Sequence, residues 1–154
     1  MRDRWRAIGV LAVALFAVNV VARLIIRLGF DGDDRAADRV SLGMFVVIGL
    51  ILATVAFRWG GRRPVADWSG DLVVGVGAAL LLTVLVGPLL TGASPFAGGA
   101  GTFFAQIWLY LAAAAAGVLL GYLLLTALGR DHRSQTLKRY AETRAAKPRR
   151  PVRR

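Results

Sequence analysis

The sequence has no cysteine and only one histidine, and it carries 9 acidic residues against 20 basic ones. Without cysteine, disulfides, thiolate metal sites and a cysteine nucleophile are excluded. His132 lies in a basic segment, where one imidazole cannot build a catalytic triad, a zinc site or a haem pair. Phosphate-binding and dinucleotide-binding glycine motifs are absent as well. We therefore expect no catalytic residue, no metal site and no cofactor, and the sequence predicts a protein that is not an enzyme.

Charge is missing from the longest stretch of the chain. Residues 72–129 are 58 consecutive positions without Asp, Glu, Lys, Arg or His. A soluble domain needs charged positions on its outer faces, so this run indicates two membrane passes. The passes are predicted at 72–90 and 103–128, and the glycine-rich segment 91–102 is predicted to connect them. Pro88 falls in the last turn of the first of these helices, where a lost backbone hydrogen bond costs least.

Two more apolar segments precede this hairpin, near residues 7–28 and 40–57. The sequence thus predicts an all-α fold, an integral membrane bundle of four transmembrane helices with short loops over residues 1–129. The first segment also resembles a secretory signal, but its apolar run continues past Ala22, so we expect it to be retained and keep cleavage as the alternative. Residues 130–154 form a basic tail, predicted to hold a helix capped by Ser134 and to be disordered from Pro148 onward.

The basic residues predict the orientation of the bundle. Sixteen of the 20 lie before the first span, between the second and third, or after the fourth, and four lie on the opposite side. The positive-inside rule then predicts a protein of the cell membrane with both termini in the cytoplasm. The acidic residues divide five to four, so the whole formal charge of +11 would face the cytoplasm.

A polar stripe interrupts the first span at four-residue intervals, which places its members on one helix face. Two residues of the fourth span enter from the same outer side at a matching depth. The candidate stripe comprises Asn19, Arg23, Arg27, Gln106 and Tyr110. In one interpretation the arginines snorkel towards the aspartates of the following loop while Asn19 bonds a neighbouring helix. In the other, the stripe faces a polar pathway or binds an anionic headgroup.

Acidic residues crowd the loop after the first span, at Asp31, Asp33 and Asp34. Clustered carboxylates suit Mg²⁺ or Ca²⁺, but the same residues also suit the start of a helix. We expect Asp33 or Asp34 to cap the second span, with no metal bound.

Small residues recur every four positions on the fourth span, at Ala113, Gly117 and Gly121. Such a face lets another helix backbone approach closely. The partner is either a helix of the same bundle or a second copy of the chain. Shorter pairs of small residues occur on the second and third spans, Gly49 with Ala53 and Gly75 with Ala79.

The sequence favours a non-catalytic membrane protein, an accessory, assembly or scaffold component of the cytoplasmic membrane. The alternative is an oligomeric small-solute or ion transporter or channel lined by the Asn/Arg stripe. Expected partners are the lipid bilayer, anionic headgroups bound by a tail of ten basic and two acidic residues, and a second copy or another membrane protein. Nucleic acid is not expected, because Tyr140 is the tail's one residue for base stacking.

Overall fold

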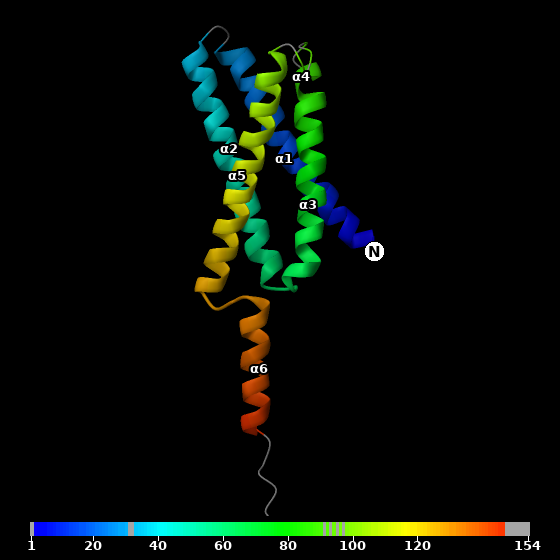
Figure 1. Ribbon diagram of the computed structural model, residues 1–154, viewed down its shortest axis with the longest axis vertical. Coiled ribbons are helices and arrows are strands. Elements are labelled where there is room, and N and C mark those ends of the chain that lie inside the picture. Colours follow the sequence, from blue (N-terminus) through cyan, green and yellow to red (C-terminus); the bar gives the residue numbers. More distant parts are fainter. Residues whose placement is uncertain are drawn as a thin grey trace, which may run out of the picture.

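The computed structural model describes residues 2–30, 33–90, 92, 94, 96 and 98–146. Long helices account for most of this part of the chain, and it contains no strand (Figure 1). The helices are α1 (Arg2–Gly29), α2 (Asp34–Gly60), α3 (Val65–Leu81), the π-helix η1 (Leu82–Val86), α4 (Gly87–Leu90), α5 (Gly99–Ala127) and α6 (His132–Ala146). The predicted all-α class is confirmed.

Four helical stretches are long and apolar enough to cross a membrane: α1, α2, the continuous run from α3 to α4, and α5. The chain is therefore a multi-pass membrane protein with four candidate spans, as predicted. Each helix extends beyond its apolar segment; α1 begins at Arg2, α3 at Val65 and α5 at Gly99, inside the segment predicted to be loop. Hydropathy locates the ends of the apolar segment, whereas the helix itself continues until its backbone is capped. The helices are therefore longer than the apolar segments that predicted them.

The four spans pack as a bundle with two distinct ends (Figure 1). The α6 end is where α5 stops and α6 begins; the far end is where α1 stops and α5 begins. At the far end, Asp33 Oδ1 accepts hydrogen bonds from the backbone N–H groups of Arg35 and Ala36 at 3.0 and 3.1 Å. This cap confirms the prediction that an aspartate of the acidic loop starts the second span. Asp31 lies outside the described residues.

The third span is not a regular helix. Its α-helical pattern widens into η1, where the N–H of Gly87 donates to the carbonyl of Leu82, five residues back. Pro88 follows in α4. Pro88 thus lies in the last turn of its span, as predicted, but the π-helix before it was not foreseen. A proline ring collides with the carbonyl four residues earlier in an α-helix and supplies no N–H, and the wider π turn changes that register.

The closest helix contact is the seam between α2 and α5. A Cβ added to Gly117 would lie 2.7 Å from the Cα of Gly49, and one added to Gly121 would lie 2.7 Å from the Cα of Ala53. Real Cβ atoms do not approach so closely, so only glycine fits at either position. The small-residue face of the fourth span thus packs inside this bundle, against the small pair of the second span.

Helix α1 lies across the bundle and packs against α3 and α2 (Figure 1). Gly75 of α3 makes room for it, because a Cβ there would lie 3.1 Å from Leu11 Cδ2. The core between the helices is aliphatic, with Leu15, Ile48 and Leu52 fully buried. In contrast, α3 and α5 touch sparsely. The bundle is thus held mainly by two pairs, α2 with α5 and α1 with α3.

The last helix leaves the bundle and extends away from it (Figure 1). Gly129, with φ of +60°, ends α5, and the N–H of Arg130 donates to the carbonyl of Leu125 at 3.1 Å. These two features form a Schellman cap, which stops the helix at its glycine. α6 then starts at His132, because Asp131 Oδ2 accepts the backbone N–H of Ser134 at 3.1 Å. Asp131, rather than the predicted Ser134, caps this helix. The predicted disorder beyond Pro148 lies outside the described residues.

Candidate functional site

A buried amide lies at the centre of the polar stripe. Asn19 of α1 is 1% exposed, and its Nδ2 donates to the sulfur of Met44 on α2 at 3.1 Å. Its Oδ1 accepts a hydrogen bond from Arg23 Nε at 3.0 Å. Because both halves of the amide are used, the side chain is held in one orientation. Asn19 therefore links α1 to α2 and fixes the position of an arginine.

Arg23 lies one turn outward from Asn19 and is partly buried. Its other neighbour is Gly87, the first residue of α4. A Cβ on Gly87 would lie 3.0 Å from Arg23 Nε, 3.4 Å from Arg23 Cζ and 3.1 Å from Asn19 Oδ1. The missing side chain therefore leaves the space that the guanidinium occupies. The π-helix just before Gly87 brings this glycine to face α1.

Two buried hydroxyls lie at similar depth. Thr83 Oγ1 in η1 and the Tyr110 hydroxyl on α5 are each buried without a hydrogen-bond partner in the described part of the chain. Thr83 is seven residues before the end of α4, a distance of about 10 Å along the helix. Tyr110 is eleven residues after the start of α5, a distance of about 16 Å. Asn19, ten residues from the end of α1, lies about 15 Å inward. We call these four residues, Asn19, Arg23, Thr83 and Tyr110, the polar layer.

The structure brings together only part of the predicted stripe. Asn19 and Arg23 are bonded, and Tyr110 is in the same buried cluster as Met44, the partner of Asn19. Arg27 is exposed and Gln106 partly exposed, and within the described residues neither forms a side-chain hydrogen bond or an ion pair. Among those residues Arg23 also lacks the predicted contact with the aspartates of the loop, since Asp33 is used as a helix cap.

A second charged site, at the α6 end, was not foreseen. Asp71 of α3 is 2% exposed. Its carboxylate accepts hydrogen bonds from Arg4 Nε at 2.5 Å and from Arg63 Nη1 at 3.4 Å. We call this group the Asp71 clamp. It joins the start of α1, the loop after α2, and α3. Its only signal in the sequence is position, since Asp71 is the last charge before the 58-residue run.

Two further residues of the site were missed for different reasons. A methionine such as Met44 is ordinarily predicted to be an apolar core residue. Its thioether sulfur is only a weak hydrogen-bond acceptor, so the sequence does not identify it as a partner for Asn19. Thr83 was hidden in an apolar run, although a Gly-Pro pair four residues later marks a departure from α-helical geometry. Helix periodicity does not predict which face of the third span carries Thr83, because the number of residues per turn changes at η1.

The chemistry open to these residues is limited. The described residues contain no cluster of three or more His, Cys, Asp or Glu side chains that could hold a metal. The polar layer offers a guanidinium and two hydroxyls, groups that bind anions or water but cannot form a nucleophile with a base. No family model, characterised protein or solved structure matches the chain.

Proposed function

We propose that the chain is a non-catalytic integral membrane protein that acts as a scaffold or assembly component. The observation that carries the proposal is α6. This helix leaves the bundle, and its Leu137 and Tyr140 side chains are 62% and 59% exposed. A helix that adds nothing to its own bundle is suited to present side chains to another molecule.

The use of the polar groups supports the same function. Asn19 joins α1 to α2, and Asp71 joins α1 to α3 and to the loop before it. These side chains are used to hold helices together. The four spans therefore serve as a rigid base for α6.

Orientation is part of the proposal. The 16 to 4 division of basic residues favours both termini, and with them α6, in the cytoplasm. A reporter fused after Arg154 tests it: a reporter that works only inside the cell should be active there. Activity of a reporter that works only outside the cytoplasmic membrane would overturn the orientation.

A pull-down in mild detergent tests the scaffold function. The full chain should capture a defined membrane or cytoplasmic protein, and a chain with Leu137→Ser and Tyr140→Ser should lose it. Glu142→Gln, on the opposite side of α6, is the matched control and should retain the partner. The same capture by all three chains would mean that α6 is not the docking element.

We also propose that the tail binds anionic lipid headgroups. Four basic side chains of α6, Arg133, Lys138, Arg139 and Arg144, are exposed, and five more basic residues follow in the sequence. Each basic residue near an anionic surface contributes at most about 1 kcal/mol. Removing residues 145–154 should leave membrane insertion intact and weaken binding to phosphatidylglycerol vesicles, as should added salt. Binding that is unchanged by truncation and by salt would refute the lipid role.

A conduit is the second candidate, favoured by the buried hydroxyls of Thr83 and Tyr110 that lack partners in the described part of the chain. Water or a solute passing between helices would use such groups. The test compares Arg23→Leu, Arg27→Leu and Gln106→Leu in cells. Normal protein amount and detergent-solubilised mass with loss of a growth phenotype in all three would favour the conduit over the scaffold. Independent phenotypes, or none, would favour the scaffold.

A further inference from the structure

Arg23 is a charged residue inside a candidate span. It is six residues before the end of α1, about 9 Å along the helix. No carboxylate of the described residues lies within 4 Å of it, and its only side-chain hydrogen bond there is the one from Nε to Asn19. The two Nη groups of the guanidinium, with four N–H donors, form no hydrogen bond within the described residues. An ionised group this deep is costly unless it is paired.

The guanidinium is also fixed in place. Asn19 is held by its hydrogen bond to Met44 and accepts a hydrogen bond from Arg23 Nε. Gly87, which has no side chain, leaves room for the guanidinium beside it. A snorkelling arginine that serves only to reach the interface needs no such cradle. With Nε bonded to Asn19, the two Nη groups remain as a fork, the geometry that binds phosphate or carboxylate through two parallel hydrogen bonds.

A second cation stands next to this fork. Arg27 is one turn further out on the same helix face, where Cβ atoms are about 5 to 6 Å apart. It is exposed and also forms no ion pair in the described residues. Two cations at this spacing can share one tetrahedral anion. Because no carboxylate of the described residues pairs with either arginine, an anion from outside this part of the chain can occupy the position between them.

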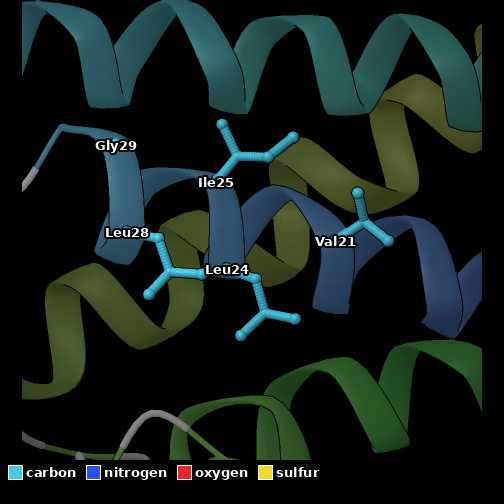
Figure 2. Close-up of a pocket in the computed structure, with 5 residues that line it drawn as sticks. All are labelled: Val21, Leu24, Ile25, Leu28 and Gly29. Carbon is cyan, nitrogen blue, oxygen red and sulfur yellow. The ribbon is translucent and has the colours of Figure 1, made fainter.

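An apolar groove lies on another face of the same stretch of α1, centred about 130° around the helix axis from Arg23 and Arg27. It has a volume of about 380 Å³ and is lined by Val21, Leu24, Ile25, Leu28 and Gly29 (Figure 2). Figure 2 shows Leu24 and Leu28 side by side on the stretch of helix that also carries Arg23 and Arg27. The groove is exposed and apolar, so it suits lipid hydrocarbon, but it does not adjoin the Arg23 guanidinium.

We propose that Arg23 and Arg27 bind the phosphate of a phospholipid in the leaflet at the far end of the bundle. The Arg23 fork holds two phosphate oxygens, and Arg27 contacts the same group from outside. This site is separate from α6, which lies beyond the other end of the bundle (Figure 1). It also does not depend on the scaffold function.

Native mass spectrometry of the full-length protein in mild detergent with added phosphatidylglycerol tests the site. Wild-type protein should retain one lipid that Arg23→Leu does not, with affinity for that lipid lowered about 10-fold to 100-fold, the effect of losing charge-assisted hydrogen bonds. Arg39→Leu is the matched control, because it removes one exposed arginine at the same end. The tail is present in all of these chains and contributes equally.

Two further arms keep the test decisive. Arg23→Lys keeps the charge but loses the fork, so it should retain less lipid than wild type even if Arg23→Leu folds poorly. Sodium phosphate added to lipid-stripped protein should not raise its melting temperature. An Arg23-dependent rise would identify free phosphate as the ligand and overturn the lipid site. Equal lipid retention by wild type, Arg23→Leu and Arg23→Lys would also overturn it.

Discussion

The two ends of the bundle use arginine in opposite ways. At the α6 end, Arg4 and Arg63 share the buried carboxylate of Asp71. At the far end, Arg23 is held by an uncharged amide, and no carboxylate of the described residues neutralises it. A charge paired inside the protein holds helices together, whereas a charge that is positioned but unpaired is available to a ligand. The same residue type is thus structural at one end and a candidate for binding at the other.

Breaking the seam between α2 and α5 should unfold the bundle and so disrupt the arginine sites at both of its ends. This is the largest effect we expect. In Gly121→Leu the new side chain meets the backbone of Ala53, which cannot move aside as a side chain can. Overpacking alone costs about 1 to 3 kcal/mol, and a backbone collision costs more. The protein should lose its monodisperse peak in detergent. Gly43→Leu, at a site with nothing within 4 Å, is the control and should behave as wild type.

Arg4→Leu should destabilise the α6 end. It leaves the buried Asp71 carboxylate with only the longer contact to Arg63, a loss of about 1 to 3 kcal/mol. Thermal unfolding in detergent measures it. Arg6→Leu is the control, because Arg6 is 3.9 Å from a fully exposed Asp3. Equal losses in the two variants would mean that the clamp contributes nothing beyond surface charge.

Arg23→Leu should have the reverse effect on stability. A central arginine costs about 2.5 to 3.5 kcal/mol on insertion scales, and no internal ion pair of the described residues is lost with it. Insertion and melting temperature in lipid-free detergent should be unchanged or raised. A fall as large as that of Arg4→Leu would show that Arg23 stabilises the bundle from within, as through its hydrogen bond to Asn19, and the contrast between the two ends would disappear.

The smallest effect concerns the start of α6. Hydrogen bonds from the Ser134 hydroxyl and then its backbone N–H hold the pKa of Asp131 below its ordinary value of 3.8. A lowered pKa means that the ionised form stabilises the helix at neutral pH and that this contribution is lost as pH falls through the lowered value. The Ser134 amide resonance should therefore titrate with a midpoint below 3.8. Asp131→Asn should abolish the titration, and a midpoint at or above the ordinary value would contradict the cap.

The sequence predicted features that depend on one segment of chain. The charge-free run from residue 72 gives two spans, an acidic residue before a helix gives a cap, and a four-residue repeat of small side chains gives a packing face. The Asp71 clamp was beyond reach because Arg4 and Asp71 are 67 residues apart, so their meeting depends on how α1 crosses α3. The choice between packing within the bundle and self-association likewise needed the position of Gly49 and Ala53.

The candidate stripe shows the same limit. Helix periodicity correctly grouped Asn19 with Arg23, because four residues separate them on one helix. It could not identify Met44 or Gly87, which belong to other helices and have no polar side chain of the usual kind. Depth matching placed Tyr110 at the right level but not within a hydrogen bond of the arginines. Partners across helices depend on rotation of each helix about its axis, which depth does not determine.

The π-helix sets that rotation for the third span. Gly75, Ala79, Thr83 and Gly87 are four residues apart and all buried. In a regular α-helix four residues overshoot a full turn by about 40°, so such a row would wind away from its neighbour within three steps. Here Gly75 meets Leu11 at one end of the row, and Gly87 meets Asn19 at the other, both on α1. The wider π turn rotates the helix back, so that Gly87 faces α1 again. Removing one residue from Leu82–Val86 would rotate Gly87 about the helix axis by about 100°. The space that holds Arg23 would then be lost, although Asn19, Arg23 and Gly87 themselves are unchanged.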